Sequence, residues 1–256
     1  MKNNRRTEVE IDIEKATKEF IKYTEQFDLN NDGIKRKQGH SLRVMQMSKK
    51  IAEKLKLDEQ DIELATLIGL LHDIGRFEQY TNKKDVDHGD LGVEILNNTI
   101  RNYIDTDQYD EIIKKAVKNH NKYKIEENLT EKEKLHAKII RDADKIDILY
   151  ESVEIYWKNQ EEKVNESKIS QEIIDEFNKE ISIKRIENET PIDDIITIIS
   201  FLYDINYNPS FEIIEKENYI NDIFKRYNFK DENTKNQIEQ IKSKANNYIR
   251  GKIWTL

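Results

Sequence analysis

Residues that form tight turns are scarce in this chain: seven glycines and two prolines stand among 256 residues. A β-rich protein of this length would need many tight turns, for which glycine and proline are the usual residues. Apolar residues instead recur at intervals of three and four between charged residues, which make up 37% of the chain. This periodicity is that of amphipathic helices. The sequence therefore predicts an all-α protein.

The same periodicity places the predicted helices along the chain. They cover residues 9–27, 37–55, 58–73, 88–96, 107–121, 130–157, 169–183, 191–205, 211–228 and 231–250. A polar loop is predicted at 81–87 and a polar linker at 158–168. Local signals mark three helix ends: Asp58 begins one helix, Gly75 stops it, and Thr190 begins another.

Charge and composition narrow the class of partner. The formal net charge is −8 and the isoelectric point is near 5.4, which disfavours nucleic acid and anionic membranes as main partners. No cysteine is present, so the chain has neither a disulfide framework nor a thiolate site. The sequence shows no signal peptide and no apolar run of about 18 residues, so no membrane span is expected. We therefore expect a cytoplasmic protein.

The segment 28–33 imitates the first half of a calcium-binding loop. An EF-hand requires an acidic side chain at the twelfth position, where this chain has Gly39, and an apolar one at the eighth, where it has Lys35. Aspartate, asparagine and glycine also form ordinary turns. We therefore predict a turn here and no calcium site.

A histidine and an aspartate stand together at the end of one apolar helix, as the doublet His72-Asp73. The helix face that leads to the doublet carries four apolar residues: Leu64, Leu67, Ile68 and Leu71. A carboxylate buried among apolar groups is unfavourable unless a cation meets it. A divalent metal ion would do so, since the doublet offers it one nitrogen and one oxygen ligand. Such doublets are common by chance, so this interpretation depends on further ligands elsewhere in the chain.

Three further histidines lie on predicted apolar faces near helix ends. They are His40, His88 and His120. A single inward histidine is more often a hydrogen-bonded core residue than a ligand. Gly92 lies one turn after His88, where a glycine weakens a helix by about 1 kcal/mol relative to alanine. This predicts that another element approaches closely beside His88.

Asp144 lies on an apolar stripe of the helix predicted over 130–157, together with Ile140 and Ile148. An unpaired carboxylate there would destabilise the fold, so Asp144 meets either a metal ion or a lysine or arginine. His136 lies two helical turns before Asp144, about 12 Å along the axis at about 1.5 Å per residue. That distance is too long for a shared metal ion, so His136 is predicted to be structural or to support a ligand.

Six inward polar residues are explained more simply by one shared site than by six separate core positions. They are His40, His72, Asp73, His88, His120 and Asp144. Imidazole and carboxylate ligands in combination suit Mn²⁺, Fe or Zn²⁺ and disfavour Ca²⁺. The sequence therefore predicts a site for a divalent metal ion.

The order of these residues resembles the HD superfamily of metal-dependent phosphohydrolases. The family pattern is His…His-Asp…Asp, which is matched here by His40, His72, Asp73 and Asp144. The local sequences at 70–75 and 141–145 also look like that family, and the resemblance covers at least residues 36–150. It implies an HD-type helical fold in which those four residues hold a first metal ion and Asp73 also bridges to a second.

Two further histidines, His88 and His120, resemble the additional ligands of the dinuclear branches, such as the HD-GYP phosphodiesterases and the symmetrical dinucleoside tetraphosphatases. The chain departs from such relatives at two positions. No Gly-Tyr-Pro follows His120, which disfavours cyclic-di-GMP as substrate. Arg76 replaces the glutamate that some mononuclear members place three residues after the doublet, where HD-GYP members have a lysine.

The resemblance implies hydrolysis of a phosphoester or phosphoanhydride in a small, nucleotide-like phosphorylated substrate. Two divalent ions, drawn from Mn, Fe, Zn, Co and Mg, would activate a water molecule, and Asp73 would be catalytic as the bridging ligand. Arg76 and Lys145 either bind phosphate oxygens or form salt bridges. Two alternatives stand beside this function: a domain that binds a metal or ligand without catalysis, and an HD-fold di-iron oxygenase.

The expected organisation has three parts. Residues 1–35 form an N-terminal helix and turn, residues 36–160 form the HD metal-binding core, and residues 161–256 form helices packed on that core in one compact domain. Neither a membrane nor a nucleic acid is expected as partner.

Overall fold

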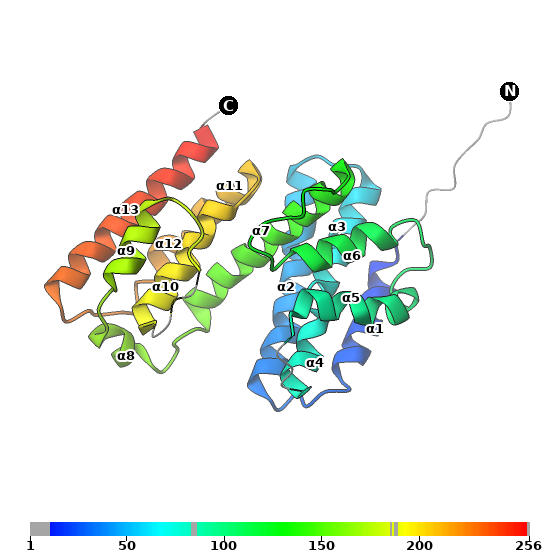
Figure 1. The fold of residues 1–256 in the computed structure, drawn as a ribbon, viewed down its shortest axis with the longest axis horizontal. Helices are drawn as coiled ribbons and strands as arrows, with labels where there is room; N and C mark the ends of the chain where they lie inside the picture. Colours follow the sequence, from blue (N-terminus) through cyan, green and yellow to red (C-terminus); the bar gives the residue numbers. More distant parts are fainter. Residues whose placement is uncertain (1–10, 83–85, 185, 187–188, 255–256) are drawn as a thin grey trace, which may run out of the picture. The chain divides into compact units, whose positions relative to one another are not determined.

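The computed structural model describes residues 11–82, 86–184, 186 and 189–254, and these residues form helices and no strand (Figure 1). The predicted all-α fold is confirmed. Among the described helices, none is both long and apolar enough to cross a membrane. The parts of the predicted helix and loop that fall on residues 9–10 and 83–85 lie outside the described residues.

The helices fall into two compact groups. The first group comprises residues Met1–Asp144 and the second comprises Lys145–Leu256. Helix α7 (Glu131–Glu154) begins in the first group and ends in the second. The packing of residues 161–256 on the core stays a prediction.

The first group is built around α3, a helix whose second half is almost entirely apolar. Its helices are α1 (Ile13–Thr24), α2 (Asp32–Lys54), α3 (Glu59–Leu71), α4 (Ile74–Asn82), α5 (His88–Thr99) and α6 (Asp110–Asn119), with the 3₁₀ turn η1 (Ile100–Asn102). Every residue of α3 from Leu64 to Leu71 is buried, as expected of a helix that is apolar on all sides. Helix α2 packs along α3, and α5 packs against both α4 and α6. The C-terminal end of α3 therefore lies inside the group.

Asparagine and aspartate side chains begin several of these helices. The Asn31 side chain accepts hydrogen bonds from the backbone N–H groups of Gly33 and Ile34, so α2 begins at Asp32, earlier than predicted. The segment 28–33 is thus a turn that ends in a helix cap, as expected. Asp58 and Asp87 cap α3 and α5 in the same way.

The prediction that Gly75 stops the preceding helix is wrong. Helix α3 ends before His72, and Gly75 lies in the first turn of α4 with no left-handed backbone. A Cβ atom at Gly75 would lie 2.3 Å from the carbonyl oxygen of His88 and 2.7 Å from the backbone nitrogen of Gly92. The glycine is therefore needed for the close crossing of α4 and α5. This crossing also confirms the close approach predicted at Gly92, where a Cβ would lie 2.9 Å from Val117.

Most helices of the second group are shorter than predicted, whereas α13 extends beyond the predicted end at residue 250. The helices of this group are α8 (Glu161–Glu166), α9 (Gln171–Asn178), α10 (Pro191–Ile199), η2 (Ser200–Asp204), α11 (Asn208–Lys216), α12 (Tyr219–Asp222) and α13 (Glu232–Trp254). The predicted linker at 158–168 contains α8, and the predicted helix at 211–228 breaks at Asn218, whose φ is 56°. The start signal at Thr190 is confirmed, since its side chain forms a capping box with Asp193.

Candidate metal centre

The six residues predicted as metal ligands come together in the first group. Helix α2 holds His40, the junction of α3 and α4 holds His72 and Asp73, α5 begins with His88, His120 follows α6, and α7 holds Asp144. Five of the six are buried, and the Asp144 side chain is 14% exposed. Burying so many polar groups in one place requires that they satisfy one another or share a ligand.

One set of ligand atoms lies around Asp144. Nε2 of His40 is 3.0 Å from Oδ1 of Asp144 and 3.2 Å from Nε2 of His72. Nε2 of His72 is 3.6 Å from the same Asp144 oxygen. The three side chains therefore aim one potential ligand atom each at a common point.

A second set lies around His88 and His120. Their Nε2 atoms are 3.0 Å apart, and each is 3.4 Å from Oδ1 of Asp73. The crossing of α4 and α5 at Gly75 produces this arrangement. It brings His88, the first residue of α5, next to Asp73, which directly precedes α4.

Asp73 links the two sets, because its two oxygens face different pairs of histidines. Oδ1 faces His88 and His120, whereas Oδ2 is 3.6 Å from Nε2 of both His40 and His72. A carboxylate that bridges two metal ions has this geometry.

The distances between these atoms suit a metal ion. Ligands bound at about 2.1 Å stand about 3.0–3.4 Å apart when the angles between them lie between 90° and the tetrahedral value. The separations are 3.0–3.4 Å in the set around Asp73 Oδ1 and 3.0–3.6 Å in the set around Asp144, where one contact is slightly longer than this range. Both sets are therefore of the right size for a metal ion.

The protonation of the imidazoles leaves lone pairs facing the carboxylates. Nδ1 of His72 is 2.8 Å from the carbonyl oxygen of Gly69, and Nδ1 of His120 is 2.6 Å from that of Val117. A carbonyl oxygen only accepts, so Nδ1 of both rings carries a hydrogen, and a neutral ring of this tautomer presents a lone pair at Nε2. Burial lowers the pKa of His72 and lowers the pKa of His88 to about 3, so both of these rings stay neutral. The Nε2 lone pair of His72 faces Oδ1 of Asp144, and a cation between these two acceptors would satisfy both, so the residues fit a metal ion.

Both carboxylates are ionised. Burial raises the pKa of Asp73, but the ammonium group of Lys37 outweighs burial and holds the pKa well below the usual value. Burial also opposes ionisation of Asp144, whose pKa is held well below the usual value by the hydrogen bond to His40. Oδ1 of Asp73 is buried and accepts no hydrogen bond. An ionised oxygen in that setting is unfavourable, and a bound cation removes the penalty.

Lys37 belongs to the site, although sequence reasoning missed it. Its Nζ is 2.7 Å from Oδ2 of Asp73, and the residue is 8% exposed. Burial lowers the pKa of Lys37, but attraction to Asp73 and Asp144 outweighs burial and raises it. The signal that was available is spacing, because Lys37 precedes His40 by three residues and so shares its helix face.

Arg76 lies at the edge of the site, with its side chain 30% exposed and its Nε 3.5 Å from Oδ1 of Asp73. Its Nη1 donates to Oε1 of Gln79 at 2.8 Å. The Gln79 amide in turn donates to the carbonyl oxygen of Val86 at 2.7 Å. These contacts hold the guanidinium group beside the carboxylate that links the two sets.

Lys145 follows Asp144 along α7 but has a partner of its own. Its Nζ is 2.8 Å from Oδ2 of Asp204, and it lies over the ring of Phe201. Consecutive residues of a helix point about 100° apart, so Lys145 does not share the direction of Asp144. The phosphate-binding role of Lys145 stays a prediction.

The fifth histidine, His136, contacts a different carboxylate from those of the site. Its Nε2 is 3.1 Å from Oδ1 of Asp61, which is also 2.7 Å from Nζ of Lys132. The hydrogen bond from His136 is the main cause that lowers the pKa of Asp61, to about 2. His136 therefore has the contacts expected of a structural histidine.

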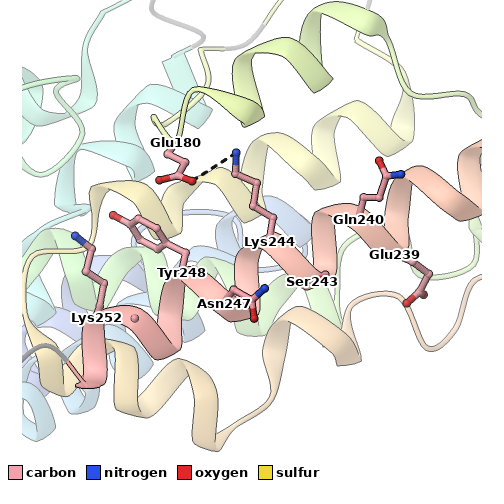
Figure 2. Close-up of a pocket in the computed structure, with 9 residues that line it drawn as sticks. Glu180, Glu239, Gln240, Ser243, Lys244, Asn247, Tyr248 and Lys252 are labelled. Carbon is pink, nitrogen blue, oxygen red and sulfur yellow. Dashed lines mark ion pairs between the residues drawn. The ribbon is translucent and has the colours of Figure 1, made fainter.

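The second group has a groove of about 900 Å³ along α13 (Figure 2). Glu180 and Lys244 at this groove form an ion pair of 3.5 Å, and Nζ of Lys252 lies over the ring of Tyr248. None of the five histidines of the chain lines the groove. It lacks the combination of imidazole and carboxylate that the first group offers.

Residues 38–149 match the family model of the HD domain, a span that runs from just before His40 to just after Asp144. The chain is also similar to the crystal structure of a predicted HD superfamily hydrolase from an uncultured Thermotogales bacterium. The two are 19% identical, the match covers 80% of this chain and 91% of the other, and the TM-score is 0.39. No curated protein matches the chain.

Proposed function

We propose that this chain, of which residues 38–149 match the family model of the HD domain, is a metal-dependent phosphohydrolase. Its proposed substrate is a small, nucleotide-like phosphoester or phosphoanhydride. The observation that carries the proposal is the division of Asp73 between two pairs of histidines, one at each carboxylate oxygen.

The proposed centre holds two divalent ions. One is assigned to His40, His72 and Asp144, the other to His88 and His120, and Asp73 is shared between them. When bound, such ions lower the pKa of a water molecule to about 7–9 and neutralise charge on phosphoryl oxygens. The candidate ions are Mn, Fe, Zn, Co and Mg, because the mixture of imidazole and carboxylate ligands does not select one of them.

Arg76 is the residue we assign to the substrate. Gln79 holds its guanidinium group at the edge of the site, where the side chain remains partly exposed. A guanidinium group can donate two parallel hydrogen bonds to a phosphoryl group, which fixes the orientation of that group as well as attracting its charge. Arg76 would therefore bind and orient the phosphate next to Asp73.

The charges of the site favour a substrate with several negative charges. The carboxylates of Asp73 and Asp144 are balanced by the cations Lys37 and Arg76. Two divalent ions would therefore give the site a large positive charge, which a polyanionic phosphate chain would offset. A nucleotide with two or more phosphates meets this requirement better than a neutral ester.

The test is a phosphate-release assay with Mn²⁺, Fe²⁺, Zn²⁺, Co²⁺ and Mg²⁺ supplied in turn. Nucleoside mono-, di- and triphosphates and dinucleoside polyphosphates are the substrates to compare. We expect release that depends on the added metal, stops with a chelator and resumes when the metal is returned.

The same preparation distinguishes the two alternative functions. Oxygen consumption measured in parallel, without phosphate release, would indicate an oxygenase. Stoichiometric metal binding with neither phosphate release nor oxygen consumption would indicate a binding domain.

A further inference from the structure

A lysine ammonium group lies inside the proposed metal centre. Nζ of Lys37 is 2.7 Å from Oδ2 of Asp73, and the side chain of Lys37 is 10% exposed. Lys37 lies on α2, one turn before His40, and the packing of α2 against α3 brings it to the end of α3. The proposed ligand set of imidazoles and carboxylates does not account for this contact.

The oxygen that Lys37 contacts is also the one that faces the first set of ligands. Oδ2 of Asp73 is 3.6 Å from Nε2 of both His40 and His72. An ammonium group and a divalent ion would therefore compete for one oxygen atom. Two cations a few ångströms apart repel strongly where water is excluded.

We propose that Lys37 is a built-in competitor of the metal ion: its ammonium group neutralises Asp73 when no ion is bound and lowers the affinity of the centre for the first ion. The proposal rests on the metal centre proposed above and does not depend on the reaction. A buried carboxylate without a counter-ion is strongly destabilising, so Lys37 allows this part of the chain to fold before it acquires metal. Because coupling between two ligands is reciprocal, removing the ammonium group tightens metal binding.

The test compares the wild-type chain with Lys37→Met, which removes the charge and keeps an unbranched side chain. Calorimetric titration with Mn²⁺ measures the affinity for the first ion, and we expect it to increase about 5- to 150-fold, the usual range of such coupling. Thermal melting in EDTA and in Mn²⁺ provides a second measurement. The variant should melt lower than wild type in EDTA, and the difference between its two melting temperatures should be larger.

Lys132→Met is the matched control. Lys132 is also 2.7 Å from an aspartate oxygen, that of Asp61, which is not a proposed ligand. Its loss should lower both melting temperatures equally and leave the Mn²⁺ affinity unchanged. If Lys37→Met does not fold in EDTA, Lys37→Gln keeps a neutral donor to Asp73, and competition of the Mn²⁺-loaded variant with a chelating dye gives its affinity.

Two outcomes would overturn the proposal. Unchanged or weaker Mn²⁺ binding in Lys37→Met, with equal losses in both melts, would mean that Lys37 only positions Asp73. Absence of Mn²⁺ binding in the wild-type chain would remove the centre itself. Metal binding without phosphate release would contradict only the proposed reaction, and the competition between Lys37 and the metal would stand.

Discussion

Two kinds of buried histidine occur within residues 1–144, and they differ in what they face. His136 faces Asp61, whose oxygen also meets Lys132, so each contact joins a donor to an acceptor. In the candidate metal centre, the Nε2 atoms of two pairs of histidines face each other at 3.0 and 3.2 Å, and each also faces a carboxylate oxygen. Burial of a histidine therefore does not identify a metal ligand. The convergence of several Nε2 atoms on shared carboxylates is the better criterion.

The most severe test of this contrast is Asp73→Ala. If Asp73 is shared by two ions, the variant should bind neither ion and lose essentially all phosphate release, because both sets of histidines lose the same carboxylate. Metal analysis of the purified variant measures the first effect, and the phosphate assay measures the second. Asp61→Ala is the matched control, since it removes a partly buried aspartate that also contacts a histidine. Full retention of one ion in Asp73→Ala would show that Asp73 does not bridge.

A smaller loss is expected from the two histidines at Oδ1 of Asp73. His88→Ala and His120→Ala should each reduce the metal content from about two ions per chain to about one, because the set around Asp144 keeps His40 and His72. Metal analysis and calorimetry give the stoichiometry. Full occupancy and activity in both variants would reduce the centre to a single ion.

Much of the first group could be predicted from local patterns. The apolar stripe of α3 and the inward position of the histidines follow from helical spacing, and the start of α3 follows from the capping residue Asp58. The six proposed ligands could also be identified, because each places a polar group on an apolar face. These features depend only on neighbours within one helix.

The features that sequence reasoning missed depend on contacts between helices. Gly75 carries no local sign that His88 and Gly92 approach it, and a glycine after a predicted helix is an ordinary helix end. The spacing of Lys37 from His40 indicates a shared helix face, but the contact with Asp73 depends on the packing of α2 against α3. Helix α8 lies where the polar composition predicted a linker. Its one buried apolar side chain, Val164, anchors this short helix, and a single apolar residue is too weak a pattern to predict a helix.

Arg76 provides an intermediate test, because it contacts the centre without being a proposed ligand. Arg76→Ala should leave the metal content unchanged and lower kcat/KM by roughly 10- to 150-fold, since a charge-assisted contact contributes about 1.5–3 kcal/mol. Arg76→Lys should recover only part of this loss, because lysine cannot make the paired contact. Unchanged kinetics with a lower melting temperature would assign Arg76 to the scaffold.

The smallest effect is expected at His136, where the contrast predicts a change in stability and none in the metal centre. His136→Ala should keep both ions and normal phosphate release. It should lose about 1–3 kcal/mol of stability, because it removes a hydrogen bond to a charged group. At about 2–4 °C per kcal/mol for a chain of this size, thermal melting measures the loss readily.

The pH dependence of that loss identifies its origin. The pKa of Asp61 is lowered to about 2 in the folded chain, against an ordinary value of 3.8. A lowered carboxyl pKa means that the unfolded chain binds more protons between these values, so the contribution is complete above pH 4 and disappears as the pH falls toward 2. The difference in melting temperature between wild type and His136→Ala, measured in EDTA, should therefore shrink as the pH falls from about 4 to about 2. A difference in melting temperature that persists unchanged at pH 2 would mean that His136 stabilises the chain through packing. The hydrogen bond to Asp61 would then no longer distinguish His136 from the four histidines of the centre.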